Sequence, residues 1–451
     1  MEDWWSERLA EAFAGRRVVL AGAVAAAWTE HVELLRSAGA TELMIVATEG
    51  RGVGPVPDLP TVVVDPPGDA TFMERIHFGN RMLEEPPPVI VDALDRFDPD
   101  GDALVIGTFL NVAPDLAGRP FLAHRRPAWV ALEDKVVVDD FWDRAGVEHR
   151  PSLVVGLGAA TDAAVEVDLG HGTVWAADAR DGFHGGAAHT HWVNDETSRR
   201  RALEGLAPVC DRVRVMPFLE GIPCSIHGIV LPDGTAALRP VELITLRRGN
   251  EFVYAGCATL WDPPGSVRRR MRRIVRATGA QLADEVAFRG AFTVDGVATA
   301  DGFWPTELNP RFGAGINTIA RASGLPVLML NELIVAGHDI GRSAAELEDE
   351  LVAAADARRG GGTWIHGTVD SPTVERRGVT LDGDGFRWSR DGDVATATVT
   401  AGAGFVRCVY EAAAIGAGPP TAPIAATFWE FADRELDTDL GWLTPPPDPW
   451  G

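Results

Sequence analysis

The chain has 451 residues, a formal net charge of −24, a pI of about 4.8 and a mean hydropathy of +0.01. Its length suits roughly two to four domains, and its acidic balance argues against binding to nucleic acid or anionic membranes, since both need a basic surface. Four cysteines without a CxxC pair, an acidic N-terminus and no apolar run of membrane-span length predict a cytoplasmic protein without disulfides or a zinc site.

Residues 1–125 alternate apolar strands with amphipathic helices. We expect helices over 1–15, 23–38, 72–84 and 89–97, and strands over 17–22, 43–47, 62–64 and 104–107. This alternation predicts a Rossmann-like α/β domain with a parallel sheet. The glycines after the first strand do not form GxGxxG, so no dinucleotide site is predicted there. A Pro-rich stretch, 119–127, marks the exit from the domain.

Lys135 is the only lysine among 41 basic residues. We expect a helix that opens at Glu133 and runs to about Ala145, with Gly146 as its end. A compact ammonium differs from a planar guanidinium, so a lysine kept in an arginine-rich chain is a candidate functional group. The alternative is that this lysine lies on the surface and has been retained by chance, without a function.

Strands are expected over 153–155 and 174–177, and a glycine-rich segment follows them at 180–188. Glycines let the backbone approach an anion closely, so Gly185 and Gly186, with His184, suit a loop folded over phosphates. A plain flexible loop is the alternative. His171, His184, His189 and His191 fit no zinc spacing, so no metal site is predicted among them.

A second module begins near 212, with strands expected over 212–216, 224–231 and 238–246. The segment 216–221 joins the modules. Its backbone at Met216, Phe218 and Leu219 suits the edge of an adenine, and Glu220 suits ribose hydroxyls. An ordinary turn between strands is the alternative. The helix at about 266–278 carries six arginines and is typical of a solvated face, or of a surface that docks an acidic substrate.

A hairpin of two strands over 289–309 carries the strongest motif. Glu307 and Asn309 are two residues apart, so they project from the same face, and Asp295 lies on the partner strand. Carboxylate and amide oxygens suit Mg²⁺. Arg311 follows, and small residues at 313–315 lead into a helix whose first amides suit an anion. An ordinary acidic hairpin with a solvated arginine is the alternative.

From about residue 360 the chain shows short Thr/Val strands, such as 396–400 and 405–410, and then a Pro-rich tail expected to be loose. The predicted organisation is α/β, with domains over 1–125, 126–211, 212–345 and 346–451. The second and third are α+β modules, and the last is small and rich in β-strands.

Taken together, the motifs resemble the ATP-grasp superfamily. They are Asp134-Lys135 before a helix that ends at Ala145-Gly146-Val147, the glycine loop, the 216–221 hinge, and Glu307-Leu308-Asn309-Pro310-Arg311 with Asp295 upstream. The loop at 178–186 and the extra C-terminal domain are similar to those of actinobacterial natural-product peptide ligases of the pheganomycin type. The first domain then corresponds to the Rossmann-like domain that precedes the two ATP-grasp subdomains.

The resemblance implies an ADP-forming ligase that uses ATP and Mg²⁺. A carboxylic acid is activated as an acyl phosphate and captured by an amino acid or peptide amine, and the enzyme is a homodimer. Lys135 would hold phosphate, Asp295, Glu307 and Asn309 would hold Mg²⁺, and Arg311 would stabilise the acyl phosphate.

Two departures from the family pattern are visible. The family has a second lysine on the strand before the glycine loop, where this chain has 175–178 without one, so Arg180 or His184 would substitute. The family's ribose-binding acid is replaced by Pro223, which leaves Glu220. The alternatives are an ATP-grasp phosphotransferase or a non-catalytic ATP-binding protein.

Overall fold

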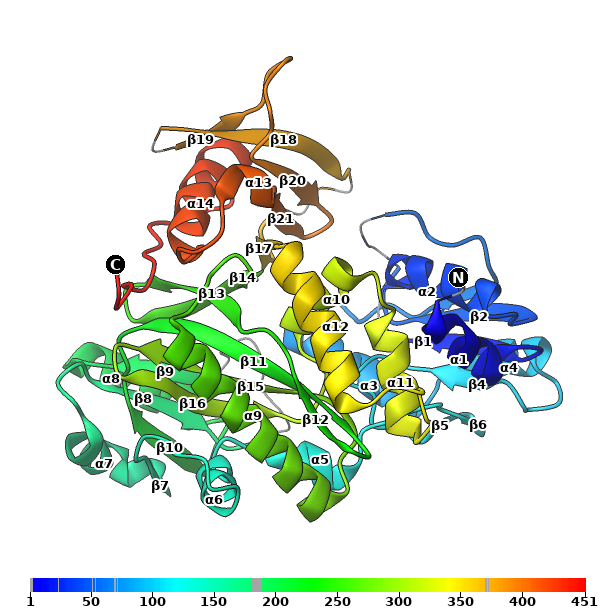
Figure 1. Ribbon diagram of the computed structural model, residues 1–451, viewed down its shortest axis with the longest axis horizontal. Helices are drawn as coiled ribbons and strands as arrows, with labels where there is room; N and C mark the ends of the chain where they lie inside the picture. Colours follow the sequence, from blue (N-terminus) through cyan, green and yellow to red (C-terminus); the bar gives the residue numbers. More distant parts are fainter. Residues whose placement is uncertain are drawn as a thin grey trace. The chain divides into compact units, whose positions relative to one another are not determined.

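The computed structural model describes residues 3–22, 24–50, 52, 54–68, 70, 72–180, 189–369, 371, 373–383 and 385–451 (Figure 1). The chain divides into two compact units. Unit 1 consists of Met1–Pro127 and Gly324–Ser343, and unit 2 of Ala128–Ser323 and Ala344–Gly451. The four domain boundaries expected from the sequence stay a prediction.

Unit 1 contains a parallel sheet with the strand order β3-β2-β1-β4. Its strands are β1 (Arg17–Ala21), β2 (Glu42–Ala47), β3 (Thr61–Val63) and β4 (Leu104–Ile106), with a separate ladder of β5 (Asp115–Leu116) and β6 (Arg119–Pro120). Its helical segments are α1 (Trp4–Phe13), η1 (Ala25–Trp28), α2 (Thr29–Ser37), α3 (Phe72–Glu84), α4 (Pro88–Phe97) and α11 (Val327–Ala336). Strands β1 and β2 are buried along nearly their whole length, as a parallel sheet requires. The predicted Rossmann-like arrangement is confirmed.

The helix expected over 23–38 begins later than predicted. A 3₁₀ turn, η1, comes first, and the α-helix starts at Thr29. The buried indole of Trp28 donates its Nε1–H to the carbonyl of Gly22 at 2.9 Å, which holds this segment close to the end of β1. Gly39 follows the end of the helix with a positive φ of 84°, a conformation that favours glycine.

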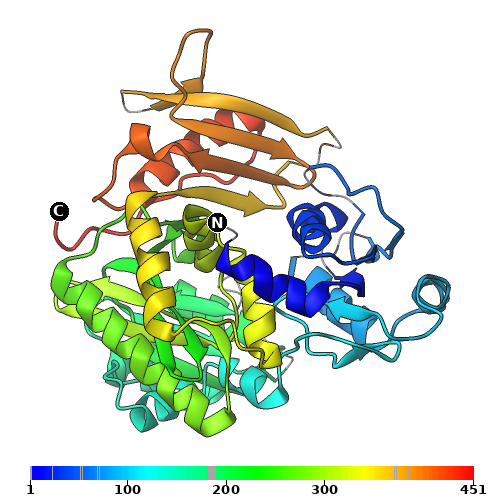
Figure 2. The ribbon, with the colours of Figure 1, turned by 45° about the vertical axis from the view of Figure 1, so that its right-hand side comes forward.

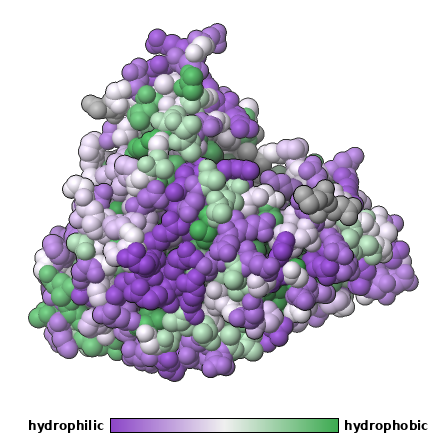
Figure 3. All heavy atoms as spheres, in the orientation of Figure 1, coloured by the Kyte–Doolittle hydropathy of each residue, from purple (hydrophilic) through white to green (hydrophobic). Residues whose placement is uncertain are grey.

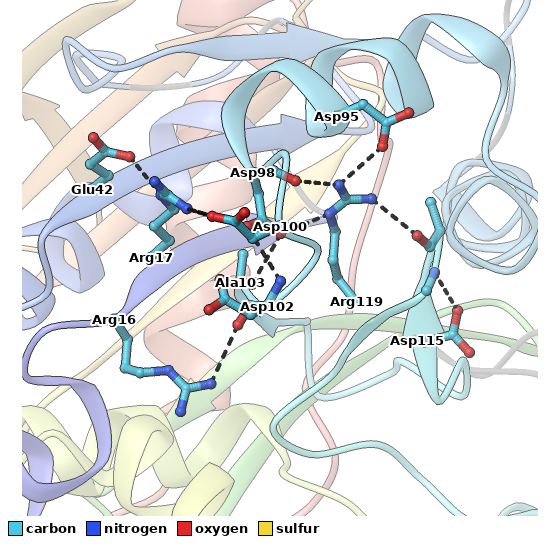
Figure 4. Close-up of polar contacts among 12 residues, drawn as sticks. Arg16, Arg17, Glu42, Asp95, Asp98, Asp100, Asp102, Ala103, Asp115 and Arg119 are labelled. Atoms are coloured by element: carbon cyan, nitrogen blue, oxygen red, sulfur yellow. Dashed lines mark hydrogen bonds and ion pairs between the residues drawn. The ribbon is translucent and has the colours of Figure 1, made fainter.

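A buried carboxylate, Asp98, connects the elements at the start of β4 (Figure 4). It accepts the backbone N–H of Ala103 at 3.0 Å and pairs with Nε of Arg119 at 3.0 Å. Burial opposes ionisation, yet these donors hold the pKa of Asp98 below its usual value. The carboxylate therefore ties the end of α4 to β4 and β6 in its charged form.

Unit 2 opens with an antiparallel sheet in the order β7-β10-β8-β9. Its strands are β7 (Leu153–Gly156), β8 (Thr173–Ala177), β9 (Thr190–Val193) and β10 (Arg212–Pro217). The helical segments around it are α5 (Pro127–Val130), η2 (Ala131–Glu133), α6 (Val138–Arg144), η3 (Leu157–Ala159), α7 (Ala160–Val167) and α8 (Glu196–Leu206). Trp175 is fully buried in the core that this sheet shares with α7 and α8.

The helix expected from Glu133 to Ala145 starts only at Val138, so this part of the prediction is wrong. Asp134 is extended, and its Oδ1 accepts the N–H of Val136 at 3.1 Å. A side chain that captures a nearby backbone N–H favours a turn over a continuing helix. Lys135 consequently lies in a turn, and Gly146 follows the helix as predicted.

The second sheet of unit 2 runs in the order β16-β15-β11-β13-β14-β17-β21-β20-β18-β19, with β12 paired to β11 (Figure 1). Its central strands are β11 (Ile222–Leu231), β12 (Gly234–Ala237), β13 (Val241–Arg248), β14 (Glu251–Ala258), β15 (Gly290–Thr299) and β16 (Gly302–Asn309). The helices beside it are α9 (Gly265–Val286), α10 (Ala314–Ser323) and α12 (Ala344–Ala357). The strand expected over 238–246 begins only at Val241, as β13, and β12 ends before it at Ala237. Pro240, which has no N–H for a ladder, lies in the break between them.

The C-terminal segment extends the same sheet, rather than forming a sheet of its own (Figure 2). Its elements are β17 (Gly361–His366), β18 (Glu375–Asp382), β19 (Gly385–Trp388), β20 (Ala397–Gly402), β21 (Phe405–Tyr410), α13 (Ala412–Ile415) and α14 (Ala422–Leu436). The expectation of a loose tail is wrong for α14, where Phe428 and Trp429 are fully buried. The carboxylate of Glu242 on β13 accepts the N–H groups of Thr421 and Ala422 and fixes the start of this helix.

Within the described ranges, no single helix has the length and hydropathy of a membrane span. Helices α10 and α11 pass that test only when they are taken together across the break between them.

Candidate active site

The predicted hairpin forms, with β15 and β16 joined by the two residues Ala300 and Asp301. Its register, continued into β11, places two rows of side chains on one face of the sheet. One row is Ser225, Asp295 and Glu307, and the next row is His227, Thr293 and Asn309. The prediction that Glu307 and Asn309 project together, with Asp295 opposite, is confirmed by this register.

Asp295 lies at the centre of these contacts. Its Oδ2 accepts the amide N–H of Asn309 at 2.9 Å, and its Oδ1 accepts the hydroxyl of Ser225. Burial, and then the negative charge of Glu307 directly opposite, raise the pKa of Asp295 to about 7. Two facing, partly buried carboxylates repel each other, so the pair favours a positively charged group beside it.

Two basic groups meet this face from the same unit. Nζ of Lys135 lies 3.1 Å from Oε1 of Glu307, and the lysine side chain is only 12% exposed. The guanidinium of Arg311 donates to Oδ1 of Asn309 at 3.1 Å, and its Nε lies 2.8 Å from Glu133. The alternatives of a surface lysine and a solvated arginine are therefore wrong. The turn before α6 brings Glu133 and Lys135 to the hairpin although they are far from it in sequence.

Two glycines after Arg311, Gly313 and Gly315, lie very close to side chains of the sheet. A Cβ on Gly315 would lie 2.3 Å from Nε2 of His227, and one on Gly313 would lie 2.3 Å from Oγ1 of Thr293. Burial lowers the pKa of His227 to about 3, so the ring is neutral, and its Nδ1 is 2.8 Å from Thr293. Only glycine fits above these two side chains, which lets the first turn of α10 lie close to the hairpin.

The sequence did not reveal the role of Arg214, which is buried on β10. Its Nε and Nη2 bond both carboxylate oxygens of Asp139 on α6, at 3.0 and 2.5 Å, and its Nη1 donates to the carbonyl of Thr306 at 2.6 Å. Thr306 directly precedes Glu307, so Arg214 connects the two sheets of unit 2 beside the site. A charged residue in an otherwise apolar strand, Val213 to Met216, was the available signal.

Arg180 turns toward the loop after α8. Its Nη1 pairs with Asp211 at 3.0 Å, and its Nη2 donates to the carbonyl of Pro208. Its expected part in phosphate binding stays a prediction. His184, Gly185 and Gly186 fall in 181–188, outside the described residues.

The predicted hinge, 216–221, contributes Phe218 to a cluster of aromatic side chains. Trp192 of β9 stacks on Phe218 with ring centroids 4.1 Å apart, and Arg247 lies over both rings. The N–H of Phe218 already donates to the carbonyl of Gly172 at 3.0 Å, and Glu220 pairs with Arg247 at 3.1 Å. Met216 is buried at the end of β10. The expected nucleotide-binding roles stay predictions for Met216, Phe218, Leu219 and Glu220. In this structure the N–H of Phe218 is already bonded to the carbonyl of Gly172.

Four of the six arginines of α9, over which hydrophilic side chains gather in Figure 3, have acidic partners. Arg272 and Arg276 pair with Glu348 of α12, Arg268 pairs with Asp356, and Arg270 pairs with Glu148. These ion pairs account for much of the basic surface of α9. Among the residues that the structure describes, no group of three or more His, Cys, Asp or Glu side chains is placed to hold a metal ion.

No protein-family model and no curated protein matches this sequence. Solved structures do match its fold. A biotin carboxylase from Campylobacter jejuni, in a "beta-gamma-ATP" complex, aligns with a TM-score of 0.58 at 13% identity over 95% of this chain and 92% of that one. The biotin carboxylase domain of 2-oxoglutarate carboxylase from Hydrogenobacter thermophilus, a dimer with MgADP, ADP and bicarbonate, aligns with a TM-score of 0.55 at 15% identity over 96% and 91%.

An N5-carboxyaminoimidazole ribonucleotide synthetase in complex with ADP aligns with a TM-score of 0.51 at 12% identity, over 88% of this chain and 93% of that one. At these identities the similarity concerns the fold. The chain has an ATP-grasp fold, with a parallel N-terminal sheet and a large antiparallel sheet, as the sequence motifs predicted.

Proposed function

We propose that the protein is an ADP-forming ligase that activates a carboxylic acid with ATP and couples it to an amine. The observation that carries this proposal is the arrangement on β15 and β16, where Asp295, Glu307 and Asn309 lie together against Lys135 and Arg311. The ATP-grasp fold supports it, and so do the nucleotide complexes of the similar structures.

The donor set fits Mg²⁺. Asp295 and Glu307 offer carboxylate oxygens, Asn309 offers an amide oxygen, and the two acids face one another across the hairpin. Hard oxygen ligands of this kind suit an ion that also binds nucleotide phosphates. Bound there, Mg²⁺ would neutralise charge on the transferring phosphoryl group.

The side chains of the chain itself would then act as follows. Lys135, whose ammonium contacts Glu307, would bind a phosphate oxygen of ATP. Arg311, held by Asn309 and Glu133, stabilises charge on the acyl phosphate. Ser225 orients Asp295 through its hydroxyl, and Arg214 holds the backbone at Thr306.

The amine then displaces phosphate from the acyl phosphate and yields an amide. Amino acids or peptides are the proposed amines, and natural-product biosynthesis is the proposed context, by resemblance alone. A homodimer is proposed as well, since the similar carboxylase domain is described as a dimer.

The test is ADP release with pools of acids and amines, for the wild type and for Glu307→Gln. This substitution removes one ligand charge while keeping the size of the side chain. We expect wild-type turnover that needs both pools and a loss of at least about 100-fold in the variant, with an unchanged thermal midpoint. Equal ADP release by the two proteins would contradict the proposal.

A further inference from the structure

In the part of the chain that the structure describes, three arginines on and beside the C-terminal strands have no acidic partner. They are Arg407 on β21, Arg376 on β18 and Arg321 on α10. Among the residues with described placement, no hydrogen bond or ion pair joins them to a carboxylate, whereas Arg387 nearby pairs with Asp382 and Asp393. Burial, and then repulsion from Arg321 and Arg376, lower the pKa of Arg407. In a chain of net charge −24 this is an uncompensated basic cluster.

The register of the sheet places two of these arginines on the face that carries the candidate active site. Paired residues share a face, and so do residues two apart on one strand. The path across the sheet runs through Glu307, Asp295, Ser225, Val241, Leu243, Cys257, Gly362, Trp364, Arg407, Thr400 and Arg376. Arg407 and Arg376 therefore project from the same face as Asp295.

This face is distinct from the one that α14 covers. Arg377, next to Arg376, projects from the other face and lies over Trp388, which packs on the core under α14. Helix α10 borders the active-site face, because Oγ1 of Thr318 lies 3.7 Å from Sγ of Cys257 on β14. Arg321 is one turn further along α10, on the same side as Thr318.

An aromatic pair lies between the two ends of this face. The ring of Tyr254 on β14 meets Trp364 edge to face, with centroids 6.0 Å apart, and Trp364 is paired with Arg407. The proposed metal ligands lie on β15 and β16, and five strand spacings separate β15 from β21, which is about 24 Å along the sheet. A molecule that reaches from the metal ligands to the arginines is therefore longer than a single amino acid.

We propose that Arg321, Arg376 and Arg407 bind an anionic group, a carboxylate or a phosphate, at the end of a substrate remote from the reacting carbonyl. The guanidinium of Arg407 is partly buried without a counter-ion, which is unfavourable, and a bidentate anion relieves this cost. Arg321 and Arg376 are exposed and add positive charge beside it. Tyr254 and Trp364 form the apolar wall along the middle of that substrate. This inference rests on the proposed ligase function for the identity of the substrate, but the anion site itself can be tested without turnover.

The first experiment measures the anion site alone. The full-length protein is labelled with phenylglyoxal in the presence of either inorganic phosphate or chloride, at equal ionic strength. Peptide mass spectrometry then measures the rate at which each arginine is modified. We expect phosphate to slow labelling of Arg376 and Arg407 at least about fivefold while Arg377 is unaffected. Equal labelling in both salts, or equal protection of Arg377, would overturn the proposal.

The second experiment compares Arg376→Gln with Arg377→Gln, which remove the same charge from adjacent positions on opposite faces. With a dicarboxylic or a phosphorylated substrate, we expect the KM to rise at least tenfold in R376Q, with little change in kcat, and to change less than twofold in R377Q. The substrate that shows the difference identifies the anion as carboxylate or phosphate.

The outcomes separate the two proposals. If no acid and amine give ADP, the ligase function fails, and the labelling result decides the anion site by itself. If ADP release is normal and R376Q matches R377Q with every dianionic substrate, the ligase function stands and the anion site is refuted.

Discussion

The buried pair of Arg214 and Asp139 gives a sharp prediction, because it connects β10, α6 and the backbone beside Glu307. Arg214→Met keeps the aliphatic bulk but removes the two contacts to Asp139, the contact to Ser152 at 3.0 Å and the contact to the Thr306 carbonyl. The side chain of Asp139 is 18% exposed, and without Arg214 its charge would keep only the hydroxyl of Ser152 and the ring of His149, 3.6 Å away, as partners. Breaking one side of such a pair costs about 3–5 kcal/mol.

The same reasoning predicts strong coupling between the two residues. In the double variant Arg214→Met, Asp139→Leu the unpaired charge is absent, so the loss of unfolding free energy should be at least about 2 kcal/mol smaller than the sum of the single losses. Urea unfolding gives these free energies, and hydrogen exchange of the β10 and α6 amides shows whether the loss of stability is centred on these two elements. A loss below about 1 kcal/mol for Arg214→Met, or additive single losses, would refute the reasoning.

Three further predictions concern separate parts of the chain. Burial raises the pKa of Glu332 to about 8 from 4.5, so the folded state binds more protons than the unfolded chain between these values, and stability should fall as the pH rises from about 4.5 to about 8. Glu332→Gln should remove that fall in thermal midpoints, and an unchanged pH profile would contradict this. Gly315→Ala would bring a Cβ to 2.3 Å from His227, so it should destabilise the protein by about 1–3 kcal/mol unless His227→Ala is added; a stable single variant in thermal denaturation would argue against the contact. Lys135→Arg keeps the charge but not the shape of the group, so it should lower ADP release at least about 100-fold at an unchanged thermal midpoint, and wild-type activity would show that the lysine is dispensable.

Local pattern predicted the elements of unit 1 and the β15–β16 hairpin well. Apolar runs between helices define a parallel sheet, and a turn between two β-branched runs defines a hairpin, because both signals lie within short stretches of sequence. The spacing of Glu307 and Asn309 placed them on one face for the same reason.

Contacts between distant segments were not accessible from the sequence. The turn at Asp134 replaced the expected helix start, and it brings Lys135 to Glu307 and Glu133 to Arg311 across more than a hundred residues. The buried Arg214 and the α14 helix, which packs beneath the C-terminal strands, depend likewise on partners far along the chain. Such partners are set by the packing of the sheets and not by local propensity.

The most direct test of the central claim follows oxygen atoms. The protein is incubated with Mg²⁺-ATP, a pool of amines and a pool of acids labelled with oxygen-18 in the carboxylate, and phosphorus NMR records the products. The account predicts ADP, together with phosphate that carries one labelled oxygen, only when both pools are present. Unlabelled phosphate, or AMP with pyrophosphate, would contradict activation of the acid as an acyl phosphate.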